Sequence, residues 1–241
     1  MRPFNNHDID FDQSIWRYMG VERLRDMLQS RTIHFAAATQ FDDPFEGAVA
    51  VQPFDFPVDP RYAEPDPGER AFRELKRLTK ISCWHREDHE SDAMWQLYSG
   101  EGKGIAIVSN ARRLDNSLGP YRIRPEYGEE DIWGGSVTYV DLMVERLRAG
   151  MMERFFYKHH AFSWEKEFRL AISVRNAEEF AVDVPEKGIA VPVDINEMIE
   201  ELHIGPNVST EDRERLFELC EDNGLRGRVR VTSLLGRPRY I

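Results

Sequence analysis

The chain has 241 residues, of which 43 are acidic and 32 are basic, so its formal net charge is −11. This negative charge opposes non-specific binding to nucleic acid, whose phosphate backbone is also negative. No apolar run approaches the ~20 residues that cross a bilayer, and the start of the sequence lacks the apolar segment of a secretory signal. Together with only two cysteines in no framework spacing, these features predict a soluble cytoplasmic protein with no membrane partner.

The first half of the chain alternates between strand and helix patterns. Apolar spacing predicts strands at 15–19, 32–37, 81–84 and 104–108, and helices at 21–28, 69–80 and 92–98. The last of these helices is expected to be capped by Ser91 or Asp92. Residues 52–68 are rich in proline, and we predict a loop insertion there.

The second half begins with a turn-rich stretch at 115–135 and then continues the alternation. We predict strands at 137–140, 162–170, 188–193, 202–205 and 229–234, and helices at 142–159, 196–201 and 210–223. The whole pattern predicts an α+β fold. We expect a single domain over 14–235, after an N-terminal extension at 1–13, with a central mixed or antiparallel sheet flanked by helices and long loop insertions.

The segment FSWEKEFRL, residues 162–170, carries the most informative charges. In an extended strand, alternate side chains share a face, so Glu165, Glu167 and Arg169 are expected to lie together. Such a charged face suits a polar functional site. It also suits a ladder of ion pairs that includes Lys158, in which each pair contributes about 0.2–1 kcal/mol.

Several motifs occur in a recognisable order along the chain. They are FDDPFEG at 41–47, SCW at 82–84, DAMWQLYSGEGKGIAI at 92–107, Lys158, and WEKEFR at 164–169. This order resembles the bacterial "domain of unknown function 2971" family, over roughly 14–235. Trp84, Phe162 and Trp164 stand where the family pattern has other aromatic residues, so the implied fold is kept. The resemblance implies no activity.

A second resemblance suggests an activity. Arg17 in the first strand, Ser82 in a later strand and the segment 165–167 in a still later strand follow the motif order of ADP-ribosyltransferases of the Arg-Ser-Glu type. The resemblance implies NAD as a co-substrate. Glu167 would then lie at the nicotinamide ribose, Glu165 would orient the acceptor, and Arg17 would contact the NAD phosphate or ribose. Ser82 would support the pocket, and the acceptor (protein, nucleic acid or small molecule) is not implied.

Three further residues are candidates for the cofactor-binding site. Trp95 and Tyr98 lie about one helical turn apart and could form a pocket wall, and Arg169 could contact the cofactor. Aromatic residues at helical spacing more often belong to the core, and we favour that interpretation for Trp95 and Tyr98. No metal is expected in a site of this type.

Two other segments carry possible ligands or nucleophiles. In the acidic turn, Asp43 and Glu46 could hold a cation, although a self-satisfied turn anchored by its phenylalanines is favoured. Cys83, His85 and His89 are zinc-type ligands without an evident fourth partner, so a surface loop is favoured there. Cys83 could also act as a thiol nucleophile beside His85. These residues leave a metal-dependent hydrolase as an alternative function.

The last predicted strand carries alternating arginines at Arg226, Arg228 and Arg230. A basic face of this kind could bind a pyrophosphate or an RNA backbone, but charge that protects an exposed edge strand is the favoured interpretation. If the charges of the chain are structural, the protein is a non-enzymatic regulatory or interaction module, for example in phage or stress defence.

Overall fold

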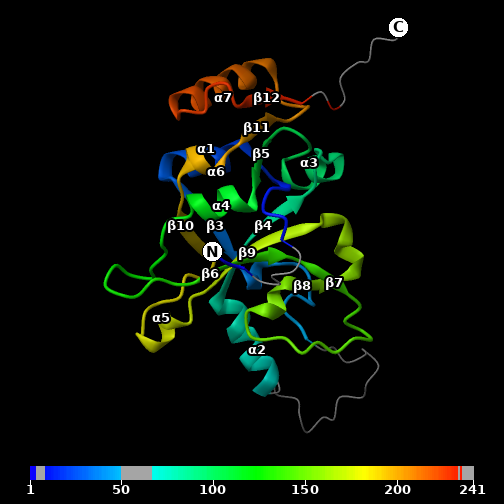
Figure 1. Cartoon of the computed structure of the whole chain (residues 1–241), viewed down its shortest axis with the longest axis vertical. Coiled ribbons are helices and arrows are strands. Elements are labelled where there is room, and N and C mark those ends of the chain that lie inside the picture. Colours follow the sequence, from blue (N-terminus) through cyan, green and yellow to red (C-terminus); the bar gives the residue numbers. More distant parts are fainter. Residues whose placement is uncertain (4–8, 50–66, 233, 235–241) are drawn as a thin grey trace. The chain divides into compact units, whose positions relative to one another are not determined.

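The structure is a computed structural model that describes residues 1–3, 9–49, 67–232 and 234 (Figure 1). The strands are β1 Arg2–Pro3, β2 Ser14–Met19, β3 Thr32–Ala37, β4 Thr79–Arg86, β5 Ile105–Asn110, β6 Ile132–Ser136, β7 Thr138–Val140, β8 Tyr157–His159, β9 Glu167–Ser173, β10 Gly188–Pro192, β11 Glu201–Ile204 and β12 Val229–Val231. The α-helices are α1 Val21–Ser30, α2 Pro67–Leu78, α3 Asp92–Tyr98, α4 Ala111–Ser117, α5 Asn176–Glu179, α6 Ile195–Met198 and α7 Thr210–Asp222. The 3-10 helices are η1 Ala38–Gln40, η3 Glu153–Phe156 and η4 His160–Glu165.

Most strands belong to one mixed sheet, in which the order is β1-β6-β9-β4-β2-β5-β11-β12. In the same sheet, β3 pairs with β4 and with β10. β2 runs antiparallel to β5, whereas β11 and β12 run parallel to each other. β7 and β8 form a separate parallel pair. The predicted α+β class with a central mixed sheet is therefore confirmed.

The chain forms two compact units, each built from three stretches of sequence. The first unit contains residues 1–9, 34–83 and 120–191, and the second contains 10–33, 84–119 and 192–241. The strands β3 and β4 run from one unit into the other, because the boundaries fall between residues 33 and 34 and between residues 83 and 84.

Each unit has its own apolar core. In the first unit, the main cluster consists of Ala38, Ile81, Phe155, Phe156 and Ala171. In the second unit, it consists of Trp16, Tyr18, Met94, Trp95, Ala106 and Val108. The second set combines alternate residues of β2 and β5 with two residues of α3, as expected where a sheet packs against a helix, whereas the first combines single residues of β4 and β9 with residues of η1 and η3.

Local capping explains where two helices of the second unit begin. Ser91 Oγ accepts a hydrogen bond from the Met94 N–H at the start of α3, which confirms the predicted cap. Ser209 Oγ accepts from the Asp212 N–H at the start of α7 in the same way. In this unit α4 and α6 pack side by side (Figure 1).

The helix predicted over 142–159 is wrong. This stretch contains a turn, the 3-10 helix η3 and the short strand β8. Its apolar pattern does not form one buried stripe, because Val144 is 77% exposed whereas Phe155 and Phe156 are both fully buried next to each other. Tertiary burial of adjacent phenylalanines thus overrides the helical spacing.

Other boundaries also differ from the prediction. The turn-rich stretch at 115–135 contains the end of helix α4 and most of strand β6. The adjacent glycines Gly134 and Gly135 concealed this strand, which pairing with β9 stabilises. Within the predicted extension at 1–13, β1 pairs with β6. Of the predicted loop insertion at 52–68, residues 52–66 lie outside the described residues. None of the described helices has both the length and the hydrophobicity needed to cross a membrane.

Candidate functional site

Five charged side chains of the first unit form one buried group, here called the charge network. Lys158 Nζ donates hydrogen bonds to Glu165 and to Glu167 Oε1, the latter at 2.6 Å. Arg169 Nε donates to Glu167 Oε2 at 2.5 Å, and its two Nη atoms donate to the carboxylate of Glu46 at 2.6 and 3.0 Å. None of the five residues is more than 6% exposed. The network is therefore shielded from solvent. Charge interactions in such a buried environment are stronger than they are in water.

A backbone reversal at Lys166 brings the two glutamates together. The 3-10 helix η4 ends at Glu165, Lys166 takes a left-handed conformation with φ of 42°, and β9 begins at Glu167. The extended strand predicted over 162–170 is therefore wrong before Glu167. Trp164 is 43% exposed and does not pack behind a strand. The predicted grouping of the three charges does form, but through a turn followed by a strand.

The two neighbouring carboxyl groups have opposite pKa shifts. Burial, together with the hydrogen bond and negative charge of Glu167, raises the pKa of Glu165 to about 7, although Lys158 acts in the opposite direction. Burial also acts to raise the pKa of Glu167, but the charge of Arg169 and the hydrogen bond with Glu165 outweigh it and hold that pKa well below its usual value. Near neutral pH, Glu165 exchanges a proton while Glu167 stays ionised. Pairs with such divided pKa values are typical of acid–base sites.

The strand β4 carries Ser82 and Cys83, the first of which is only 1% exposed. Burial, and then the negative charge of Glu167, raise the pKa of the Cys83 thiol well above its ordinary value. Since the thiolate is the reactive form, this environment disfavours Cys83 as a nucleophile.

The acidic turn satisfies its own backbone, in agreement with the favoured interpretation. Asp43 Oδ1 accepts from the Phe45 N–H at 2.9 Å, and the Asp43 carbonyl accepts from the Glu46 N–H at 3.1 Å. Phe41 packs against the core cluster of the first unit. Glu46 points inward and is fully buried on Arg169, so its carboxylate is engaged in an ion pair and is not presented to a cation.

The remaining predicted cofactor-binding residues belong to the second unit. The Arg17 guanidinium lies 5.6 Å from the centroid of the Trp84 ring, in a cation–π arrangement. Trp95 is fully buried and its Nε1 donates to Glu90 at 2.9 Å, which favours the core interpretation for this residue. Tyr98 is 47% exposed and so retains a surface that a ligand could contact.

His85 and His89 differ in their surroundings. His85 lies on β4, is 4% exposed, and places its ring edge-on to Tyr18 at 6.4 Å. The predicted surface loop is therefore wrong for His85, whereas His89 is exposed. Among the described residues, Asp141, His159 and His160 form a group whose ligand atoms lie close enough together to hold a metal ion. The sequence analysis missed this group, although adjacent histidines after a short β-prone run were a visible signal.

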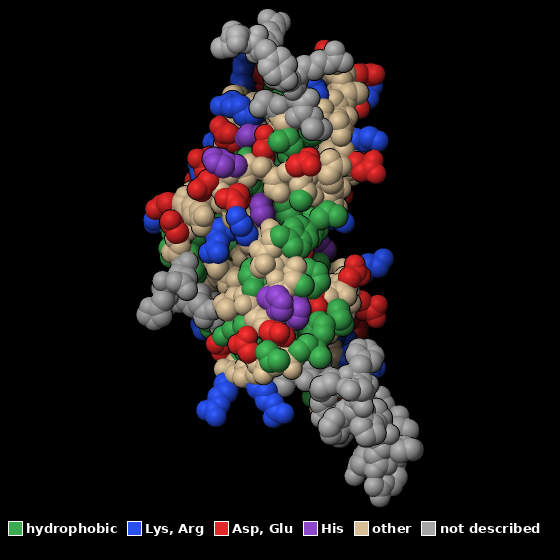
Figure 2. All heavy atoms as spheres, turned by 90° about the vertical axis from the view of Figure 1, so that its right-hand side faces the viewer, with side chains coloured by type: hydrophobic (Ala, Val, Ile, Leu, Met, Phe, Trp, Pro, Cys, Tyr) green, Lys and Arg blue, Asp and Glu red, His purple; other side chains and the backbone are tan. Residues whose placement is uncertain are grey.

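Of the three arginines predicted on the last strand, only Arg230 lies on β12, and all three are engaged with neighbouring groups. Arg226 pairs with Glu221 at 3.1 Å, and Arg230 pairs with Glu201 at 3.4 Å. Arg228 donates to backbone carbonyl groups of the second unit. Figure 2 shows acidic and basic side chains interspersed on the face drawn. These contacts favour the structural interpretation of the arginines.

Comparisons of the chain with family models, with curated proteins and with solved structures give no match. The two family resemblances therefore stay predictions. The functional argument rests on the geometry of the chain itself, above all on the buried charge network.

Proposed function

We propose that the protein is an NAD-dependent transferase of the ADP-ribosyltransferase type that acts through Glu165 and Glu167. The observation that carries this proposal lies within the first unit: Glu165 and Glu167 are buried side by side on Lys158, and their pKa values are shifted in opposite directions. Ser82 on β4 and Glu167 at the start of β9 belong to the first unit, whereas Arg17 on β2 belongs to the second.

The balance of charge in the network supports the proposal. Three carboxyl groups interact with two basic side chains, which leaves one carboxyl group in excess. A carboxylate beside a ribose stabilises the positive charge that develops when the bond at its anomeric carbon breaks, as carboxylates do in glycosidases. In a site from which water is excluded, a single electrostatic group of this kind is worth ~3 kcal/mol or more.

The divided pKa values assign separate roles to the two glutamates. Glu167 stays ionised and supplies the negative charge, while Glu165, with its pKa raised to about 7, accepts a proton from the acceptor group. Both oxygens of Glu167 accept hydrogen bonds from Lys158 or Arg169. Binding of a ribose hydroxyl group therefore requires Lys158 to release Glu167 and remain on Glu165. NAD, when bound, supplies the ADP-ribosyl group and nicotinamide as the leaving group.

The first unit also has a pocket, in which two arginines are accompanied by two glutamates. This pocket has a volume of about 450 Å³, and Arg154, Arg175, Glu74 and Glu178 line it together with several apolar residues. The Arg154 Nε atom is buried without a hydrogen-bond partner, so it could donate to an anionic oxygen. By contrast, Asp88 and Glu90 are among several acidic residues that line a pocket of about 430 Å³ on the second unit, and that pocket does not fit a pyrophosphate.

The test is to incubate the full chain with NAD and to measure the release of nicotinamide, with protein, nucleic-acid and small-molecule acceptors added in separate reactions. We expect release by the wild type and a loss of about 100-fold or more in Glu167→Gln. Glu165→Gln is expected to lose transfer to the acceptor more than it loses hydrolysis of NAD. Glu22→Gln, at an exposed position on α1, is the matched control and should behave like the wild type.

Two outcomes would overturn the proposal. One is that the wild type releases no nicotinamide above the buffer rate with any acceptor class. The other is that Glu167→Gln, shown by circular dichroism and thermal melting to be folded, releases it as fast as the wild type.

A non-enzymatic regulatory or interaction module is the second candidate function. The observation that favours it is that both oxygens of Glu167 are already hydrogen-bonded, as expected of a structural ion-pair network. In that case the network serves only to hold β8, η4 and β9 together. Glu167→Gln would then lower stability, while NAD would remain intact with every variant.

A further inference from the structure

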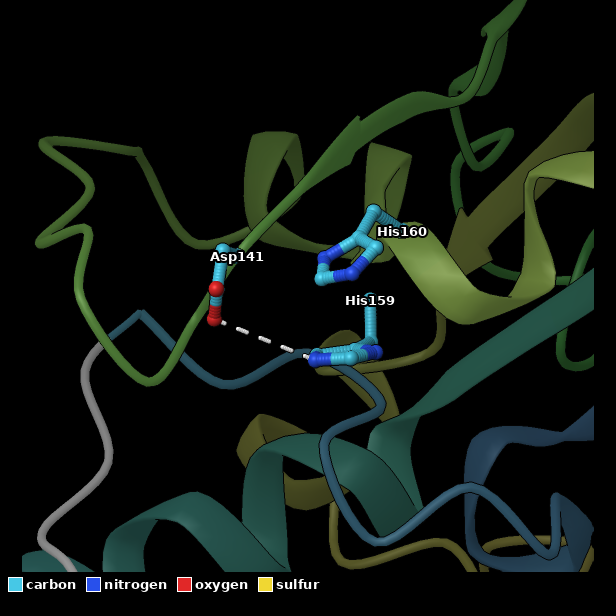
Figure 3. A group of neighbouring side chains, drawn as sticks. All are labelled: Asp141, His159 and His160. Carbon is cyan, nitrogen blue, oxygen red and sulfur yellow. Dashed lines mark ion pairs between the residues drawn. The ribbon is translucent and has the colours of Figure 1, made fainter.

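We propose that Asp141, His159 and His160 form a binding site for a divalent transition-metal ion such as Zn²⁺ (Figure 3). One ligand atom from each of these residues lies within 4.8 Å of the others. The site lies in the first unit, involves none of the residues assigned to the transferase chemistry, and does not depend on that proposal.

The fold explains why these three residues meet. β7 and β8 run parallel, with Val140 opposite His159 in the register. The carboxyl ends of parallel strands lie at the same edge, so Asp141, directly after β7, comes close to His159 and His160 at the end of β8. Figure 3 shows the three side chains converging from these two segments.

Neighbouring groups hold two of the proposed ligands in place. Asp141 Oδ1 accepts from the Met143 N–H at 3.0 Å, which fixes the carboxylate. Phe45 stacks on His159, with ring centroids 5.4 Å apart and an interplanar angle of 28°. The ring centroids of His159 and His160 lie 4.4 Å apart. His160 is exposed. Ligands fixed in this way lose little conformational freedom when a metal binds.

The hydrogen bonds of His159 indicate what metal binding must change. Its Nδ1 atom accepts from the Ala161 N–H at 3.2 Å, so the proton of the neutral ring lies on Nε2, which faces Asp141 Oδ1 at 3.9 Å. A cation that binds at Nε2 moves this proton to Nδ1 and breaks the hydrogen bond to Ala161. His159 is therefore the weakest of the three ligands, and we expect micromolar rather than nanomolar affinity.

The set of donor atoms indicates the class of metal. Two imidazole nitrogens and one carboxylate oxygen suit Zn²⁺ and its transition-metal neighbours, with water in the remaining coordination position. Ca²⁺ and Mg²⁺ prefer a shell of oxygen atoms, so neither is expected to compete at equal concentration.

The experiment is calorimetric titration of the full chain with Zn²⁺, together with the visible absorption spectrum of Co²⁺ added in its place. We expect one saturable Zn²⁺ per chain and the intense absorption of four-coordinate Co²⁺. His160→Ala and Asp141→Asn are each expected to weaken binding by at least about tenfold. His160 is exposed, and Asn keeps the side-chain oxygen that accepts from Met143, so both variants should fold.

His89→Ala is the matched control, since it removes an exposed histidine from the second unit and should leave the affinity unchanged. The proposal is overturned if the wild type binds no Zn²⁺ in a saturable way. It is equally overturned if folded His160→Ala and Asp141→Asn bind as the wild type does.

Discussion

Arg169 and Glu46 lie 123 positions apart in the sequence and form a bidentate ion pair in which neither side chain is exposed. The pair ties the acidic turn to strand β9. Arg169 Nη1 also donates to the Phe155 carbonyl at 2.6 Å, so a single guanidinium joins three segments of the first unit. Removing a buried group with this many partners lowers the free energy of unfolding strongly, because each partner would be left unpaired.

We therefore expect Arg169→Ala to lower the free energy of unfolding by about 3–5 kcal/mol, since it leaves Glu46 and Glu167 buried without their cation. Urea-induced unfolding followed by tryptophan fluorescence measures this change. Arg215→Ala, which removes an exposed arginine of α7, is the control and should have little effect. Equal stabilities for the two variants would show that the ion pair is not important for the fold.

The stability of the protein should fall as the pH rises from about 4.5 to about 7. The folded state raises the pKa of Glu165 from 4.5 to about 7, so it binds this proton more tightly than the unfolded chain does. The contribution of Glu165 is fully present below pH 4.5 and is lost as the pH passes 7. We expect a loss on the order of 2–3 kcal/mol in the free energy of unfolding between pH 5 and pH 8.

Glu165→Gln separates this contribution from those of other titrating groups. Glutamine resembles the protonated glutamate and does not ionise, so the variant should lose less stability than the wild type over the same pH range. At pH 8 it should be at least as stable as the wild type. An identical fall with pH in both proteins would remove Glu165 as the cause.

Two glycines with similar backbone conformations should respond differently to substitution by alanine. Gly47 has φ of 76°, and a Cβ there would lie 2.6 Å from Phe155 Cε1, whereas Gly100 has φ of 66° and nothing within 4 Å. We expect Gly47→Ala to cost about 2–4 kcal/mol from backbone strain and overpacking, and Gly100→Ala about 1 kcal/mol from strain alone. Thermal and urea unfolding of both variants measure the difference, and equal costs would contradict the close packing at Gly47.

Both cysteine thiols should react slowly in the folded protein. Burial raises the pKa of the Cys220 thiol to about 11, and the pKa of Cys83 is also raised well above its usual value. At pH 8 we expect slow reaction with a disulfide reagent in buffer and rapid reaction of two thiols in urea. Ser30→Cys, at an exposed position, provides a reactive reference. Rapid modification of native Cys83 would restore it as a candidate nucleophile.

Local sequence signals predicted the fold well where they were strong. The cap at Ser91 and the strands predicted at 15–19 and 104–108 correspond to the start of α3 and to β2 and β5. The helix predicted over 142–159 failed because burial of Phe155 and Phe156 depends on distant parts of the first unit. Such non-local packing leaves no periodic pattern in the sequence.

The candidate site was predictable in part. Glu165, Glu167, Arg169 and Lys158 do group together, as the charge-ladder interpretation predicted. The left-handed conformation of Lys166 was not predictable, because lysine has no special preference for positive φ. The addition of Glu46 depends on its contact with Arg169, 123 positions away in the sequence, which spacing along the chain does not reveal.

The division of the chain into interleaved stretches has a consequence for how this protein is made. Since each unit draws on three separate stretches, no continuous fragment contains all of one unit without much of the other. A cut between residues 34 and 191 leaves neither unit whole and should therefore yield aggregation-prone fragments. During synthesis, the first unit is complete only once residue 191 has been translated, and the many distant pairings favour slow folding.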